Sequence, residues 1–248
     1  MSESLLDFEW QLPRGVRAAF TTRRGGVSAA PWDSFNVATH VNDDPAQVAT
    51  NRARLRELLQ LEYEPAWLSQ VHGISVSDLD SAAALSTPVR ADAAVSTRAG
   101  AACVVMVADC LPVLFATRDG ARIGAAHAGW RGLASGVLEN TVQALRAPGH
   151  DLIAWLGPCI SREHFEVGDD VREEFVKQDP CASAYFDKNS RGRWQADLVG
   201  LARCRLERLG ITEIAGGQWC TYADRERFFS HRRDGRGGRL AALIWREP

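Results

Sequence analysis

Short, continuous apolar runs in the middle of the chain constrain its fold more than any other sequence feature. They cover residues 101–107, 111–116 and 152–156. Each run is short for a buried helix, and none alternates apolar with polar residues as a strand with one solvent face does. Runs of this kind are typical of strands that are covered on both faces. The chain is therefore expected to place other layers of structure on each side of its sheets.

Other segments have the patterns of further strands and of helices. Residues 16–22, 74–79, 122–127 and 240–245 have strand patterns, and apolar residues over 133–145 have helical spacing. Two more helices are expected after Asp169 or Asp170 and after Asp197. Asp44, Pro45 and Gln47 predict an N-cap, a first-turn proline and a capping box for a helix ending near residue 60. Because the order is not strictly β-α-β, we predict an α/β (α+β) sandwich, with mixed β-sheets flanked by helices, rather than a doubly wound parallel sheet.

Composition limits the domain organisation, compartment and partners. No repeat or low-complexity linker interrupts the chain, which predicts a single catalytic domain over residues 1–248. The first 15 residues lack the apolar core of a signal peptide, no 18-residue apolar run exists, and the six Cys form no CxxC pair. These features predict a cytoplasmic protein. The formal charge of −2 favours neither nucleic acid nor a membrane as partner, and a monomer or small homo-oligomer is expected.

Three residues able to bind a metal stand at the ends of apolar runs. They are His72, Cys110 and His127, separated by 38 and 17 residues. Two imidazoles and one thiolate suit zinc and leave a fourth position open for water, as in catalytic zinc sites. The alternative is that both His are ordinary polar residues at strand ends and Cys110 is a small buried apolar residue. The spacing matches no compact zinc pattern, so both interpretations stay open on spacing alone.

The segments around these residues resemble the YfiH, or laccase-domain, family. The resemblance runs in family order from residue 20 to the end of the sequence. The matching segments are FTTRRGGVS at 20–28, QVHG at 70–73, ADCLPV at 108–113, AHAGWRG at 126–132, GPCI at 157–160 and FFSHRR at 228–233. The resemblance implies that His72, Cys110 and His127 bind one catalytic zinc. It also implies a sandwich of mixed sheets that is similar in outline to a group of Cys/His hydrolases.

The resemblance implies a zinc enzyme of purine nucleoside metabolism. Such an enzyme cleaves adenosine, inosine, guanosine or methylthioadenosine with phosphate, giving the base and ribose 1-phosphate, and also deaminates adenosine. Purine nucleoside and phosphate are then its small-molecule partners. Members of the family have also been described as copper-dependent, laccase-like polyphenol oxidases. A further role attached to the family is that of an editing amidase, which removes misincorporated residues from cell-wall precursors.

Candidate substrate residues follow from the chemistry of these reactions. Deamination needs a carboxyl group that moves protons, and Asp109 beside Cys110 is our candidate, with a turn-capping role as the alternative. For phosphate we expect Arg23 and Arg24, beside glycines whose amides could form an anion nest, and Arg131 within the 129–132 turn. Weaker candidates stand in the Arg-rich segment near the end of the sequence. They are Arg232, Arg233 and Arg239.

Three alternatives to an open zinc site remain. Copper also binds two His and a Cys, but six His in the whole chain are few for a multinuclear oxidase. A closed, structural site in a binding module would need a fourth ligand, for which Cys103, Cys159 and His40 are candidates. An amidase could instead use Cys110 as the nucleophile, paired with His127.

Overall fold

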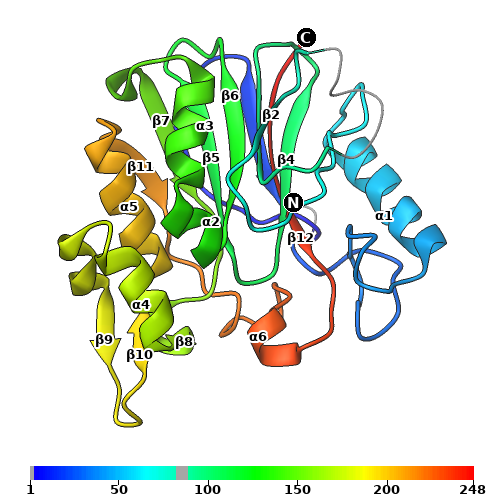
Figure 1. Ribbon diagram of the computed structural model, residues 1–248. Coiled ribbons are helices and arrows are strands. Elements are labelled where there is room, and N and C mark those ends of the chain that lie inside the picture. Colours follow the sequence, from blue (N-terminus) through cyan, green and yellow to red (C-terminus); the bar gives the residue numbers. More distant parts are fainter. Residues whose placement is uncertain (1–2, 82–88) are drawn as a thin grey trace.

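Two β-sheets of different size form the centre of the computed structural model, which describes residues 3–81 and 89–248 (Figure 1). The larger sheet has the order β11-β7-β5-β6-β3-β2 and the smaller one the order β1-β12-β4. The strands of the larger sheet are β2 (Val76–Asp78), β3 (Ala93–Ser96), β5 (Leu111–Thr117), β6 (Ile123–Ala128), β7 (Leu152–Leu156) and β11 (Glu213–Gly216). Those of the smaller sheet are β1 (Val16–Phe20), β4 (Ala102–Val107) and β12 (Leu240–Arg246). The larger sheet contains parallel and antiparallel pairs, which confirms the prediction of mixed sheets.

Helices cover the outer faces of both sheets. The helices are α1 (Pro45–Leu58), α2 (Trp130–Ser135), α3 (Val137–Leu145), α4 (Asp169–Val176), α5 (Leu198–Arg208) and α6 (His231–Asp234). Short 3₁₀ helices lie at Gly149–Asp151, Arg162–His164 and Pro180–Tyr185. Figure 1 shows α1 on one side of the sheets, with α2, α3 and α5 on the other. Within the described ranges, no helix is long and apolar enough to cross a membrane.

The central strands are apolar throughout because both of their faces are buried. In β4, Val105 and Val107 pack between the two sheets, whereas Val104 and Met106 pack under α1. In β5, alternate side chains likewise face the other sheet or the helices α2, α3 and α5. The molecule thus has four layers, in the order helices, larger sheet, smaller sheet and α1. This layering explains the apolar runs and confirms the predicted sandwich.

The predicted start of α1 is correct at its cap and wrong at its capping box. The Asp44 carboxylate accepts a hydrogen bond from the Ala46 amide, as an N-cap residue does. The Gln47 side chain does not turn back to the cap, because its Oε1 accepts from the amide of Ala29 instead. The segment 26–36 packs beside α1, where the buried Asn51 accepts from the Val27 amide. The Gln47 side chain therefore binds the segment 26–36 instead of the backbone at the helix N-terminus.

The structure differs from the predicted elements in two further ways: one predicted helix is divided at a glycine, and several short strands were not predicted. The helix expected over 133–145 is divided, because Gly136 adopts φ 103° between α2 and α3. The strand β3 was not predicted from the sequence. A third, small antiparallel sheet was also missed. Its strands are β8 (Glu166–Val167), β9 (Phe186–Lys188) and β10 (Trp194–Ala196).

Candidate metal centre

The pairing of three strands brings distant residues to one edge of the larger sheet. Strands β5 and β6 pair with Leu111 opposite Ala128, so Cys110, immediately before β5, lies beside the end of β6. Strands β3 and β6 pair with Ala93 opposite Ala126, which places Asp92 across from His127. His72 reaches the same edge from the segment that precedes β2. The order of the strands in the sheet therefore brings His72, Cys110 and His127 together, although they are far apart in the sequence.

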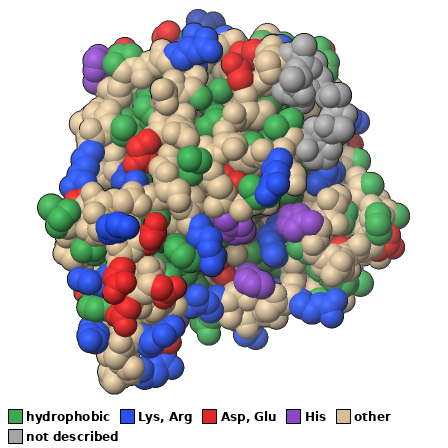
Figure 2. All heavy atoms as spheres, viewed as in Figure 1, with side chains coloured by type: hydrophobic (Ala, Val, Ile, Leu, Met, Phe, Trp, Pro, Cys, Tyr) green, Lys and Arg blue, Asp and Glu red, His purple; other side chains and the backbone are tan. Residues whose placement is uncertain are grey.

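The three predicted ligands lie together. One ligand atom from each of His72, Cys110 and His127 lies within 4.8 Å of the others. The Sγ of Cys110 is 3.8 Å from Nε2 of His72, and the two imidazole rings meet edge to face, with centroids 4.8 Å apart. His127 is buried, Cys110 is half-buried and His72 is exposed. The group therefore opens toward solvent on the side of His72. On the face drawn in Figure 2, His side chains gather among Lys and Arg side chains.

Asp92 positions two of these ligands and was missed in the sequence. Its side chain is fully buried, and its Oδ1 lies 2.9 Å from Nδ1 of His127. The same carboxylate accepts from the backbone amides of Val71, His72 and Gly73, at 3.2, 2.8 and 2.7 Å. With Nδ1 committed to Asp92, His127 has only Nε2 left for an ion. An Asp directly before the apolar residues of β3 was the available sequence signal.

The charges of the cluster support one another. Burial alone would raise the pKa of the Cys110 thiol, but the charge of His127 and hydrogen bonds from both imidazoles lower it to about 6. Burial alone would lower the pKa of His127, but the Cys110 thiolate and the hydrogen bond to Asp92 raise it to about 9. Cys110 is thus disposed to be a thiolate, the form that binds metal ions and acts as a nucleophile.

Backbone conformation around the cluster is specialised. His72 and Asp109 adopt positive φ, at 61° and 91°, which non-glycine residues rarely do and which clusters at functional sites. Gly129 has an ordinary φ of −62°, yet a Cβ there would lie 2.9 Å from Cys110 Sγ and 3.0 Å from His72 Cδ2. Glycine is required at this position by space rather than by φ.

This donor set fits a single small cation. In a tetrahedral zinc site, ligand atoms lie about 3.3–3.7 Å apart, close to the sulfur–nitrogen separation seen here. In the part of the chain that the structure describes, the cluster has three members and lacks a fourth His, Cys or carboxylate. The two cysteines that were candidates for a fourth ligand are not members of the cluster. Cys103 lies within β4, and the backbone of Cys159 forms an isolated bridge with that of Cys220. His40 also lies outside the cluster. His72, Cys110 and His127 could therefore hold a metal ion with one position open.

Comparison with known proteins shows the family of this chain. The family described as multi-copper polyphenol oxidoreductase laccase matches residues 17–247. The chain belongs to this laccase-domain family. A Pseudomonas aeruginosa protein named purine nucleoside phosphorylase PA4543 is 51% identical over 238 residues, covering 96% of each chain. Escherichia coli YfiH, also named a purine nucleoside phosphorylase, is 48% identical over 237 residues, again covering 96% of each.

Solved structures share the fold of this laccase-domain chain. The crystal structure of Neisseria meningitidis protein NMB0706 superposes with a TM-score of 0.94 at 44% identity, covering 99% of this chain and all of that one. YlmD from Geobacillus stearothermophilus superposes with a TM-score of 0.86 at 31% identity, covering 95% of this chain and 93% of that one. The sandwich of mixed sheets predicted from the sequence is thus shared along nearly the whole chain.

Asp109 directly precedes the candidate ligand Cys110, and both oxygens of its carboxylate accept hydrogen bonds. One oxygen accepts from the Thr221 hydroxyl and the other from the Arg232 amide, each at 2.6 Å. Asp109 therefore fastens the Cys110 loop to the segment around Thr221 and to the start of α6. Its predicted part in proton transfer stays a prediction.

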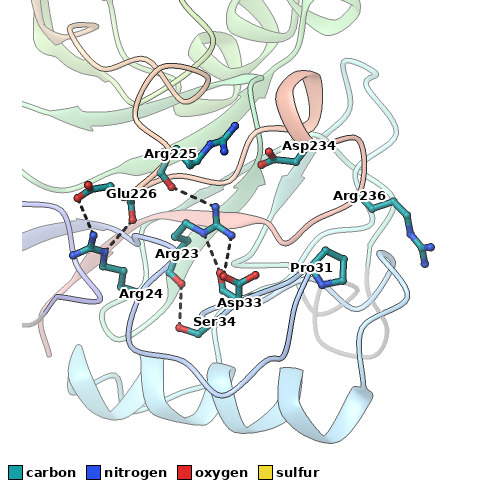
Figure 3. Close-up of a pocket in the computed structure, with 9 residues that line it drawn as sticks. All are labelled: Arg23, Arg24, Pro31, Asp33, Ser34, Arg225, Glu226, Asp234 and Arg236. Carbon is teal, nitrogen blue, oxygen red and sulfur yellow. Dashed lines mark hydrogen bonds and ion pairs between the residues drawn. The ribbon is translucent and has the colours of Figure 1, made fainter.

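The structure pairs Arg23 and Arg24 with carboxylates. Arg23 binds the Asp33 side chain and the Arg225 carbonyl, and Arg24 binds Glu226 (Figure 3). Both arginines line a cavity of about 620 Å³ whose lining includes none of the three candidate metal ligands. One amide of the expected anion nest is also engaged, because the Gly26 amide donates to the Ser34 hydroxyl.

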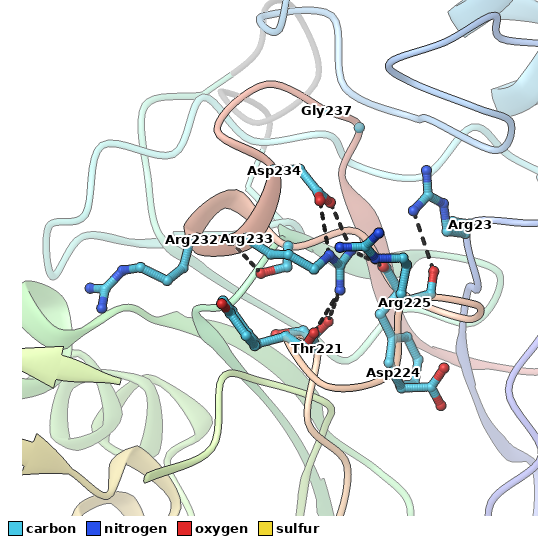
Figure 4. Close-up of polar contacts among 12 residues, drawn as sticks. Arg23, Thr221, Asp224, Arg225, Arg232, Arg233, Asp234 and Gly237 are labelled. Atoms are coloured by element: carbon cyan, nitrogen blue, oxygen red, sulfur yellow. Dashed lines mark hydrogen bonds and ion pairs between the residues drawn. The ribbon is translucent and has the colours of Figure 1, made fainter. Parts of the chain in front are cut away.

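The remaining candidate arginines differ in the contacts that their side chains make. Arg131 is exposed, at the start of α2, and its guanidinium lies 4.3 Å from the centroid of the Trp130 ring. Arg233 is fixed, since it donates to three backbone carbonyls and pairs with Asp234 (Figure 4). Arg232 donates to a carbonyl of β8, and Arg239 donates to carbonyls of its own segment.

Proposed function

We propose that this chain is a zinc-dependent purine nucleoside phosphorylase that also deaminates adenosine. Its substrates would be adenosine, inosine, guanosine or methylthioadenosine, with phosphate, and its products the base and ribose 1-phosphate. The observation that carries the proposal is the open cluster of His72, Cys110 and His127. Relatives that are named purine nucleoside phosphorylases and match 96% of the chain support it. We further propose that residues 1–248 act as one catalytic domain.

Each residue of the cluster would have a distinct part. A bound zinc ion would supply a Lewis acid that stabilises negative charge as the purine departs. Cys110 and His127 would hold that ion, with Asp92 fixing the imidazole through Nδ1. His72, on the exposed side, would complete the ligand set beside the entering substrate. We propose Asp109 as the proton carrier for deamination, which would require its carboxylate to exchange one of its two hydrogen bonds.

We propose that Arg23, Arg24 and Arg131 contribute to binding phosphate or substrate, with Arg131 first among them. Its guanidinium is exposed and stacked on Trp130, four residues after His127, and it forms no ion pair in the described structure. A planar guanidinium with free donors suits bidentate phosphate binding. Arg23 and Arg24 would first have to release Asp33 and Glu226.

Product analysis tests the proposal directly. Zinc-loaded protein is incubated with inosine or adenosine, with and without phosphate, and the products are separated. Free base released only with phosphate, together with ribose 1-phosphate, is the expected result, and inosine formed from adenosine reports the deaminase. Cys110→Ala should lack both activities, whereas Cys181→Ala, at an exposed cysteine, should keep them. No turnover by the zinc-loaded protein would refute the proposal.

An amidase is the second candidate, because Cys110, His127 and Asp92 could act as nucleophile, base and orienting acid, in that order. The thiol has a pKa lowered to about 6, and Asp92 orients the imidazole. Metal-free protein that cleaves an amide-bearing cell-wall precursor, and whose Cys110 is labelled by a substrate-like electrophile, would support this candidate. Activity that requires zinc would refute it.

Copper remains an alternative metal, since the same donors bind it. Over the described residues, one cluster of three ligands is present, which supports a single ion over a multinuclear copper centre. Metal analysis of protein prepared without added copper separates the two. Stoichiometric copper without zinc, together with polyphenol oxidation, would favour the oxidase.

The six cysteines are free, as expected in a reducing compartment, which supports our proposal of a cytoplasmic enzyme. Its partners would be small molecules, without nucleic acid or membrane, and it would act as a monomer or small homo-oligomer.

A further inference from the structure

Two cysteines outside the group of candidate metal ligands are backbone neighbours in the fold. Cys159, which follows β7, and Cys220, which follows β11, are partners in an isolated parallel bridge. The Thr221 amide donates to the Cys159 carbonyl at 2.9 Å, and the Cys159 amide donates to the Trp219 carbonyl at 3.4 Å. Backbones paired in this way lie about 4.8 Å apart. A disulfide requires Cα atoms about 4.4–6.8 Å apart, so the backbone already has the spacing that the bond needs.

The two thiols differ in exposure. Cys159 is buried, and its Sγ lies 3.5 Å from the carbonyl oxygen of its neighbour Ile160. Cys220 is half-buried, and its Sγ accepts from the amides of Ser161 and Ala223, each at 3.4 Å. Burial raises the pKa of the Cys159 thiol, and the nearby sulfur of Cys220 raises it further. The pair thus combines one cysteine that is partly open to solvent with one that is buried.

We propose that Cys159 and Cys220 are a redox-active pair that hydroperoxides oxidise to a reversible disulfide. Cys220 Sγ attacks the peroxide, so that an S–O bond forms and the O–O bond breaks. The departing oxygen takes the proton of the Cys220 thiol and leaves as an alcohol, or as water from hydrogen peroxide. Cys159 Sγ then attacks Cys220 Sγ, so that the S–S bond forms and the S–O bond breaks, and the hydroxyl leaves as water with the proton of the Cys159 thiol. Two thiols are oxidised and one peroxide is reduced.

The position of the pair connects it to the metal centre. The residue after each cysteine binds Asp109: the Ile160 amide donates to its carbonyl at 2.9 Å, and the Thr221 hydroxyl donates to its carboxylate at 2.6 Å. A disulfide between Cys159 and Cys220 would covalently link the two segments that hydrogen-bond to Asp109, the residue before Cys110. It consumes none of the three metal ligands, so the oxidised protein keeps its ion.

Oxidation of the zinc-loaded, full-length protein tests this inference. The protein is treated with hydrogen peroxide, free thiols are alkylated, and peptides are mapped without reduction. We expect a mass loss of about 2 Da, a peptide that links Cys159 to Cys220, full reversal by dithiothreitol and unchanged zinc content. A linked peptide that contains Cys110, or oxidation that stops at sulfinic acid, would overturn the proposal.

Matched variants keep the test decisive. Cys220→Ser, at a half-buried site, should abolish the mass loss, and Cys181→Ser, at an exposed cysteine, should not change it. Cys159→Ser should also abolish the mass loss. Because it replaces a buried residue, its result is interpreted only if its unfolding curve matches that of the parent protein. The Cys220→Ser variant suffices without it, because a mass loss retained there contradicts the inference.

Discussion

The carboxylate of Asp92 lies 2.9 Å from Nδ1 of His127, and both side chains are almost completely buried. Through its backbone contacts the same carboxylate also holds the loop of His72. One acidic side chain therefore sets the relative position of two ligands that are 55 residues apart in the sequence.

Replacing Asp92 with Asn should weaken zinc binding about 10–100-fold, as expected for loss of a group that orients a metal-bound imidazole. Both carboxylate oxygens of Asp92 accept hydrogen bonds, whereas the amide nitrogen of Asn cannot accept one. Contacts to the imidazole or to the loop amides are therefore lost. Competition with a chromophoric chelator measures the affinity. Asp151→Asn, at an exposed Asp, is the control, and equal affinity of the two variants would contradict the assigned role.

Gly129→Ala should reduce zinc affinity by about tenfold or more, because a methyl group 2.9 Å from Cys110 Sγ must displace a ligand. Gly237→Ala is the matched control, since a Cβ at that position meets its nearest heavy atom at 3.6 Å. The chelator assay applies to both variants. A Gly129→Ala protein with parental affinity would show that the cluster can shift without cost.

Arg131→Ala should raise KM for phosphate about tenfold or more while leaving the free energy of unfolding unchanged. A charge-assisted hydrogen bond contributes about 1.5–3 kcal/mol, and the exposed Arg131 makes no ion pair within the described structure whose loss would destabilise the fold. Arg14→Ala, at an exposed Arg, is the control. Steady-state kinetics at varied phosphate, together with urea unfolding, separate binding from stability, and an unchanged KM would remove Arg131 from the phosphate site.

Asn51→Ala should lower the free energy of unfolding by about 3 kcal/mol. The buried Asn51 accepts from the Val27 amide and donates to Ser28, Ser34 and Asn36, so its loss leaves several buried groups without partners. Urea unfolding measures the change. Thr50→Ala, at the exposed neighbour, should change it by less than about 0.5 kcal/mol. Equal effects would show that water replaces the amide.

Asp80→Asn should destabilise the protein near neutral pH but not in acid. Burial works to raise the Asp80 pKa, yet hydrogen bonds from Ser96 and Thr97 outweigh it and leave the pKa lowered. A carboxylate with a lowered folded-state pKa stabilises the fold above its ordinary pKa, about 3.9, and loses that contribution as the pH falls through the lowered value. Urea unfolding at pH 7, 5 and 3, with Asp7→Asn as control, should show the difference shrinking toward pH 3.

Sequence patterns predicted the buried strands, because a strand covered on both faces is apolar at every position. The same logic failed for β3, where alanines and a serine have little strand propensity and only the sheet around them makes the strand. Spacing alone could not bring His72, Cys110 and His127 together, since their proximity depends on strand order and register. Asp92 and Asn51 were missed for a related reason: their partners are distant in sequence.

Strand order also has a consequence for the growing chain. In its sheet, β1 pairs with β12 alone, and the contact between Thr21 and Ala241 just beyond this pairing spans 220 residues. On the ribosome, β1 must therefore wait without its sheet partner until residues 240–246 have been made. During that interval its apolar face and unpaired edge are available to chaperones or to other chains.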